Sequence, residues 1–188
     1  VLRRGNYLMP GEEVTSQTPE ALHGFKEEWP KNRLGLSKWL VAPDNPLVGR
    51  VTVNRWWAQF MGRGIVATQE DFGIEGSTPT HPSLLDWLAV ELVESGWSLK
   101  HLHRLLMTSA AYQQSSTVSA EHRLRDPDNR WFSRMPLRRM EAEVVRDSLL
   151  SMSDQLNRRA FGPADQIDSR EDGLVTSRAQ AGGYRRSI

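Results

Sequence analysis

The sequence NPLVGRVTVNRWWAQFMGRG, residues 45–64, predicts an amphipathic helix with a defined start and a defined end. Asn45 can cap the free amides of the first turn, and Pro46 suits the first helical position because it has no amide hydrogen to leave unpaired. Gly62 and Gly64 favour termination of the helix. Between these ends, apolar side chains recur at steps that place them broadly on one face: Leu47, Val48, Val51, Trp56, Phe60 and Met61.

Apolar periodicity on either side of this stretch predicts further helices. A short one covers residues 34–41. Two successive helices cover residues 81–95 and 98–110, and so few residues separate them that a tight corner is expected. The longest follows Pro136 and runs to about Arg158, with a predicted buried stripe of Met140, Val144, Val145, Leu149, Met152 and Leu156. We therefore expect a mainly α fold of about four to five orthogonally packed helices, with long irregular loops and extended termini.

Three segments follow from this pattern. Residues 1–33 contain several Gly and Pro without a sustained period, which indicates an irregular arm or linker. Residues 34–163 form the predicted helical domain, and residues 164–188 a polar loop or the start of a segment that is cut short. Because the last residues resemble the start of a strand, we expect the chain to be a fragment of a longer protein: Gly182-Gly183-Tyr184-Arg185-Arg186-Ser187-Ile188.

The composition narrows the class of function. The 24 Lys and Arg residues balance 23 Asp and Glu, a formal net charge of +1, so nucleic-acid binding is not expected. No apolar run approaches the length of a membrane span. The chain contains no cysteine, which excludes disulfides, thiolate metal sites and a cysteine nucleophile within it. We expect neither a metal ion nor a cofactor in this chain.

The roles of residues at helix starts and ends leave a small set of polar residues unexplained: Arg50, Asn54, Arg55, Arg63, Asp71 and His81. The first four lie around Trp56 and Trp57, and Arg50 and Asn54 share a helix face. One interpretation is a binding site, in which Arg holds a carboxylate or sulfate while Trp stacks on a ring. The other is that the arginines pair with acids on neighbouring helices, the Trp side chains fill the core, and His81 caps or locks a helix start. The sequence leaves both interpretations open.

Other chemical motifs are incomplete. Asp71-Phe72-Gly73 matches a kinase tripeptide, but the sequence lacks a kinase's glycine-rich and catalytic loops, so a turn is expected. His101 and His103 are two residues apart on a helix and point to different sides, which argues against a metal site. Glu143 and Asp147 share a helix face and could perform acid–base chemistry as in glycoside hydrolysis, although flanking arginines favour an ion network. No catalytic residue is assigned.

A series of ordered motifs carries a resemblance to one family. In chain order the motifs are Asn45-Pro46-Leu47, Val53-Asn54-Arg55-Trp56, Gly62-Arg63-Gly64, Asp71-Phe72-Gly73, Thr80-His81-Pro82, Ser95-Gly96-Trp97-Ser98-Leu99-Lys100 and Asp126-Pro127-Asp128-Asn129-Arg130. The series resembles the planctomycete PSD-one domain of unknown function over roughly residues 34–163. The resemblance implies an exported, extracytoplasmic multidomain protein in a redox or polysaccharide-related context. It also implies that any haem would belong to a separate cytochrome-c-like domain, and it supplies no catalytic residues.

Two functions of different class are compatible with these observations. The first is a structural or interaction module that packs on other domains of the same polypeptide, within an exported redox-associated protein. The second is an enzyme or binding domain for an acidic or sulfated polysaccharide, whose pocket is formed by Arg50, Asn54, Arg55 and His81. A concave site where such side chains converge without saturating one another would favour the second.

Overall fold

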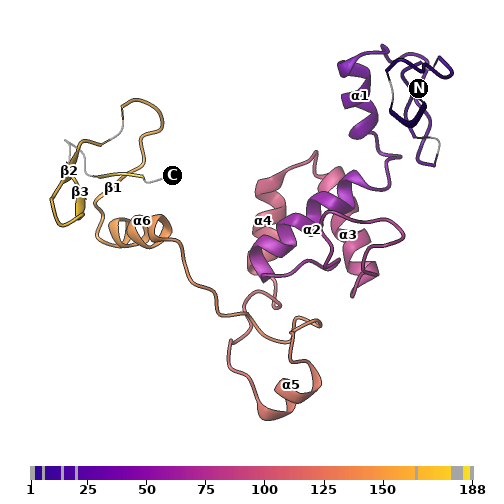
Figure 1. Ribbon diagram of the computed structural model, residues 1–188. Coiled ribbons are helices and arrows are strands. Elements are labelled where there is room, and N and C mark those ends of the chain that lie inside the picture. The colour runs from indigo at the N-terminus through magenta and orange to yellow at the C-terminus, as the bar shows by residue number, and fades with distance from the viewer. Residues whose placement is uncertain are drawn as a thin grey trace. The chain divides into compact units, whose positions relative to one another are not determined.

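The computed structural model, drawn in Figure 1, describes residues 3–5, 7–13, 15–19, 21–163, 165–178 and 184–186. Its contacts divide the chain into two compact units. The first unit spans Val1–Pro136 and the second Leu137–Ile188. The described residues contain six α-helices and four short strands, so the prediction of a mainly α fold is confirmed. The expected boundaries after residues 33 and 163 remain predictions, because a compact unit need not be an independently folding domain.

The first unit contains the helices predicted between residues 34 and 110. In chain order its elements are the 3₁₀ helix η1 (Arg3–Gly5), α1 (Arg33–Leu40), α2 (Val48–Met61), α3 (Pro82–Glu94), α4 (Leu99–Thr108) and α5 (Ala120–Arg125). Helices α1 to α4 match the predicted segments to within a few residues. Helix α5 was not predicted, because its sequence is polar and lacks apolar periodicity. Its first turn is capped by Ser119, whose hydroxyl accepts a hydrogen bond from the His122 amide at 3.1 Å.

Helix α2 begins and ends where the capping residue and the glycines in the sequence predict. The Asn45 Oδ1 accepts hydrogen bonds from the amides of Leu47 at 3.0 Å and Val48 at 3.1 Å. Gly62 follows the last turn with a φ of 79°, a left-handed conformation that a residue without a Cβ adopts at little cost. Residues next to the helix in sequence therefore determine both ends of α2.

Helices α2, α3 and α4 pack on one another around a single apolar core. Two further segments contribute to it: the loop after α2 through Ile65 and Val66, and the segment after α5 through Phe132. The remaining buried members are Val53, Trp57, Met61, Leu85, Leu88, Leu92, Leu102 and Leu106. The core therefore fixes the loop that carries several of the candidate site residues.

The second unit combines one helix with short strands: α6 (Ala142–Met152), β1 (Leu156–Asn157), β2 (Ile167–Ser169), β3 (Val175–Ser177) and β4 (Tyr184–Arg185). Strand β1 pairs in parallel with β4, and β2 pairs with β3 in antiparallel orientation. The prediction of a helix to about Arg158 is wrong. The helix ends at Met152, Asp154 takes a φ of 56°, and Leu156 enters a strand. Of the strand-like C-terminal sequence, residues 179–183 and 187–188 lie outside the described part.

The prediction of a buried stripe on this helix is also wrong. The exposed fractions are 38% for Val144, 41% for Val145, 61% for Leu149 and 85% for Met152, and Met140 just before the helix is 55% exposed. The physical reason is that periodicity identifies which side chains share a face but not which face is covered.

Candidate functional site

Asn54 lies in the interior of the first unit and not at its surface. Its side chain is 0% exposed, and both of its polar groups bond to Val66. The Nδ2 donates to the Val66 carbonyl at 3.0 Å, and the Oδ1 accepts from the Val66 amide at 2.9 Å. Because Val66 is only 3% exposed, these bonds satisfy backbone groups that water does not reach. Asn54 thus ties the loop after α2 back onto α2.

Arg50 and Arg55 both extend from α2 to carboxylates. The Arg50 Nε donates to Asp86 Oδ1 on α3 at 2.6 Å, and its Nη1 donates to the Pro46 carbonyl at 2.5 Å. The Arg55 Nη2 donates to both carboxylate oxygens of Glu70, at 3.2 and 3.0 Å. Both ion pairs are partly exposed, so each contributes only about 0–1 kcal/mol to stability. These contacts fit the interpretation in which the arginines pair with acids of the same fold.

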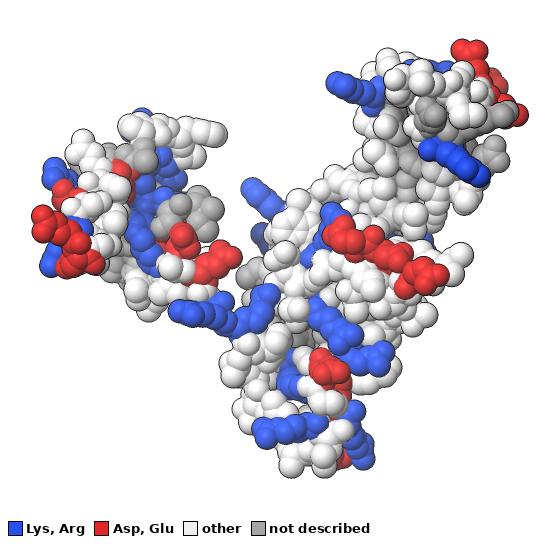
Figure 2. All heavy atoms as spheres, in the orientation of Figure 1, with Lys and Arg blue, Asp and Glu red and all other residues white. Residues whose placement is uncertain are grey.

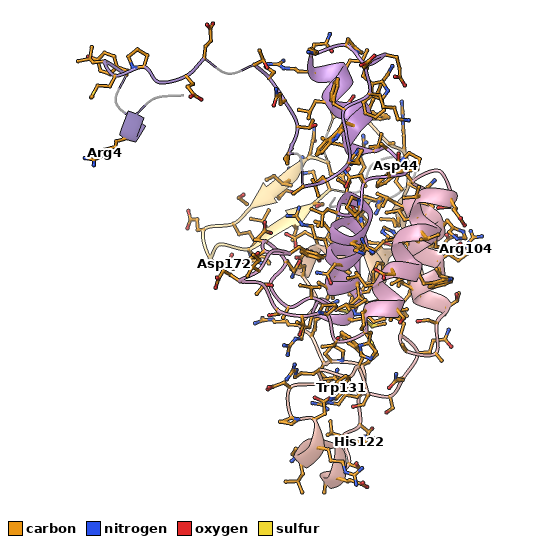
Figure 3. The ribbon with its side chains drawn as sticks, turned by 90° about the vertical axis from the view of Figure 1, so that its right-hand side faces the viewer. Arg4, Asp44, Arg104, His122, Trp131 and Asp172 are labelled. Carbon is orange, nitrogen blue, oxygen red and sulfur yellow. The ribbon has the colours of Figure 1, made fainter. Side chains whose placement is uncertain are left out.

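Asp71 and His81 make local contacts. The Asp71 Oδ1 accepts the Gly73 amide at 2.7 Å, which closes the expected turn. His81 precedes α3, but its side chain makes no capping hydrogen bond. Its ring instead meets Trp131, labelled in Figure 3, and Phe132, with centroids 5.7 and 5.5 Å away. His81 therefore joins the start of α3 to the segment after α5.

Arg63 lies at intermediate exposure just after α2. It has no hydrogen bond or ion pair with the part of the chain that the structure describes. Of the three candidate arginines, Arg63 is the one whose charge has no carboxylate partner among the described residues.

The six residues lie outside two cavities of the described part of the chain. One cavity of about 620 Å³ lies among residues 16–36, and another of about 420 Å³ lies beside α6; none of the six candidates lines either. Figure 2 shows basic and acidic side chains interspersed over the visible surface, in keeping with the balanced composition. A binding site built from these six residues remains a prediction, and contacts within the first unit already occupy five of them.

A charged cluster in the second unit contains Asp147 of the expected ion network. The Arg146 Nη1 donates to Asp147 Oδ1 at 3.1 Å and to the Arg185 carbonyl at 2.9 Å, while its guanidinium lies 5.9 Å from the Tyr184 ring centroid. The Asp165 Oδ2 accepts the Arg185 amide at 2.8 Å. The cluster ties α6 to β4. Sequence reasoning placed Asp147 and the arginines that flank it in a network but could not supply partners from residues 165–185.

The pKa values of Asp168 and Arg178 are shifted by an ion pair on the hairpin formed by β2 and β3. The Arg178 Nε donates to Asp168 Oδ2 at 2.7 Å, and Nη2 contacts the other carboxylate oxygen. These hydrogen bonds hold the pKa of Asp168 below its usual value, and the same bonds raise the pKa of Arg178. Since both side chains are exposed, the pair stabilises the hairpin locally and does not indicate a reactive site.

The larger cavity lies in the segment predicted to be an irregular arm. This segment is attached to α1 by a reciprocal contact: the Trp39 Nε1 donates to the His23 carbonyl at 2.9 Å, and the His23 Nε2 lies 3.0 Å from the Trp39 carbonyl oxygen. The two rings stack with centroids 4.7 Å apart. A signal that could have revealed this structure is the set of aromatic residues Phe25, Trp29 and Trp39 in and beside a segment otherwise rich in Gly and Pro.

Neither a metal site nor a membrane span is present in the described parts of the chain. There, no group of three His, Asp or Glu side chains is placed to hold a metal ion. None of the helices described combines the length and apolarity needed to cross a bilayer.

Comparison with known protein families gives a match over most of the chain. A family model, PSD1, described as a protein of unknown function (DUF1553), matches residues 32–188. No curated protein and no solved structure matches the chain significantly. The matched range includes helices α1 to α6 and all six candidate residues, but it excludes most of the segment that forms the larger cavity. The chain therefore belongs to the PSD1 family of proteins of unknown function (DUF1553).

Proposed function

We propose that this chain is a non-catalytic interaction module of a longer, exported, redox-associated polypeptide, and that it docks on a neighbouring domain through α6. An uncovered apolar stripe of Val145, Leu149 and Met152 carries the proposal. Steps of four and three residues place these side chains on one face of the helix. The exported and redox-associated setting is supported by the resemblance of the motif series to domains that accompany cytochrome-c-like domains.

The other side of α6 is attached to the second unit. Arg146 donates to the Arg185 carbonyl at 2.9 Å and to the Ser177 hydroxyl at 3.3 Å, and Asp147 is only 15% exposed at its side chain. The helix is therefore held from one side while its apolar stripe faces outward. An amphipathic helix presented in this way suits docking into an apolar groove, with anchors at i, i+4 and i+7.

The partner we propose is an apolar groove on another domain of the same polypeptide and not a second copy of this chain. Helix α6 has 11 residues. Such a helix is about 16 Å long and about 10 Å wide, so one face offers roughly 200 Å². Stable complexes bury about 800 Å² per partner, so two copies joined through α6 would separate. A tether raises the effective concentration to about the millimolar range, where a small interface is sufficient.

The alternative is a site for acidic or sulfated polysaccharide formed by Arg50, Asn54, Arg55 and His81. It has less support, because Asn54 is fully buried and uses both polar groups on Val66. Both arginines also have carboxylate partners. A ligand at this place would have to replace existing bonds instead of satisfying free groups.

The absence of cysteine from the chain allows a direct test. Leu149→Cys places one thiol in the stripe, and Glu143→Cys is the matched control at an exposed position of the same helix, about 120° around its axis. Maleimide labelling at each position is followed by peptide mass, in the 188-residue chain and in the longer polypeptide. We expect the Leu149→Cys thiol to react at least about tenfold more slowly in the longer polypeptide, as burial at an interface requires, and the control to be unchanged. Equal rates for Leu149→Cys in both proteins would contradict docking through α6.

A further inference from the structure

The cavity of about 620 Å³ among residues 16–36, here called the arm cleft, has the size of a small-molecule site. Such sites typically measure about 300–1,000 Å³ and combine apolar walls with a few polar groups. The arm cleft lies within the first unit and is separate from the α6 stripe. A ligand for the arm cleft can therefore be inferred independently of the proposed docking through α6.

The arm cleft has a fixed wall. The reciprocal hydrogen bonds and ring stacking between His23 and Trp39 hold the arm against α1. Gly35 allows close packing at the same place, since a Cβ there would overlap the Pro30 carbonyl and approach the Phe25 ring to 2.8 Å. These contacts hold one side of the cleft in place before any ligand arrives, which lowers the entropic cost of binding.

Two aromatic rings form a corner in the cleft. Phe25 and Trp29 are perpendicular, at 90°, with centroids 5.5 Å apart, and both are only partly buried. The Lys26 ammonium lies 5.3 Å from the Trp29 centroid. The corner therefore offers apolar ring surface directly beside a positive charge.

The charge of the cleft favours an anion. Its lining contains Lys26, Lys31 and Arg33 against the single acidic side chain of Glu27, so three positive charges minus one negative leave a net +2. None of the three cations has an ion pair with a carboxylate in the described ranges, in contrast to Arg50, which pairs with an acid of its own fold. Unpaired cations gathered in a concave site attract anionic ligands.

We propose that the arm cleft binds an anionic sugar, that is, a saturated ring carrying a carboxylate or a sulfate. The ring would pack against Trp29 and Phe25, and its charged group would lie between Lys31 and Arg33. The sugar hydroxyls would find neutral partners in Ser16, Gln17 and Thr18 of the lining. A nucleotide base would use the same ring face, so AMP is the competing ligand that the test must separate from an anionic sugar.

Calorimetric titration of the 188-residue chain tests the proposal with five probes: a galacturonic acid trisaccharide, a sulfated galactose disaccharide, neutral maltotriose, sodium sulfate and AMP. We expect at least one acidic sugar to bind about tenfold or more tightly than the other three probes, the difference that one charged hydrogen bond supplies. Whichever of the two acidic sugars binds better identifies the preferred anionic group.

Variants locate the site. Lys31→Ala combined with Arg33→Ala should weaken acidic-sugar binding about tenfold or more. Lys38→Ala is the matched control, since Lys38 is an exposed cation of α1 outside the lining, and it should change the affinity less than about twofold. The indole N–H resonance of Trp29 should shift on binding. The proposal is overturned if neither acidic sugar binds, if a neutral sugar, sulfate or AMP binds equally well, or if the control weakens binding as much as the double variant.

Discussion

Replacing Asn54 by Ala tests the claim that this residue has a structural role. The change removes both partners of the buried Val66 backbone, the donor 3.0 Å from its carbonyl and the acceptor 2.9 Å from its amide. Each buried group left unsatisfied costs about 1–3 kcal/mol. The expected loss in the free energy of unfolding is therefore about 2–6 kcal/mol, a large fraction of the roughly 5–15 kcal/mol of a typical domain.

Urea unfolding followed by tryptophan fluorescence is the suitable assay. All seven Trp residues lie at or before Trp131, within the first unit, so the signal reports the unfolding of that unit alone. With a urea dependence of about 2 kcal/mol per molar, the midpoint should fall by about 1–3 M.

Arg55→Ala is the matched control, because Arg55 is the next residue on α2 and its ion pair with Glu70 is exposed at both side chains, 54% and 86%. This variant should lose no more than about 1 kcal/mol. If Asn54→Ala costs no more than Arg55→Ala, the reasoning from buried hydrogen bonds is refuted.

Three further substitutions have defined outcomes. Gly64→Ala should destabilise the first unit by about 1–3 kcal/mol in the same urea assay, since the new methyl would overlap the Val66 carbonyl, and a loss below about 0.5 kcal/mol would contradict this. Ser98→Ala should cost about 1 kcal/mol by removing the hydroxyl that caps α4, with an unchanged midpoint as the opposing result. In the second unit, Arg178 depresses the folded-state pKa of Asp168. The pair therefore stabilises the hairpin fully at a pH above 3.8, the ordinary pKa of the carboxyl group. This stabilisation is lost as the pH falls through the lower pKa of the folded state. A carboxyl NMR titration should give Asp168 a pKa below 3.8 that returns to its ordinary value in Arg178→Ala; identical pKa values in both proteins would argue against the pair.

The sequence was sufficient to predict helices α1 to α4, because their ends depend on nearby residues. The Asn45 cap acts two and three residues away, and the Gly62 terminus depends on one backbone angle. Helix α6 ended early for an equally local reason, the left-handed conformation of Asp154, which the polar sequence did not reveal. The apolar periodicity within α6 does not show whether another part of the protein covers its apolar face.

The roles of the candidate site residues were harder to predict, because their partners are distant in sequence. Asn54 bonds to a residue 12 positions away and Arg50 to one 36 positions away. An unpaired Arg and a paired Arg look alike in sequence, so both interpretations of these residues stayed open. The arm cleft was missed for a related reason. Its walls depend on the contact between His23 and Trp39, which are 16 residues apart.

The most direct test of the interaction-module claim is methyl NMR of the 188-residue chain, labelled at Val, Leu and Met, during titration with the remainder of the longer polypeptide. Weak binding is measurable in this way even when the tether is absent. The account predicts shifts confined to the methyl groups of Val145, Leu149 and Met152. Unchanged α6 methyls, or shifts centred on the α2 residues around Asn54, would contradict it.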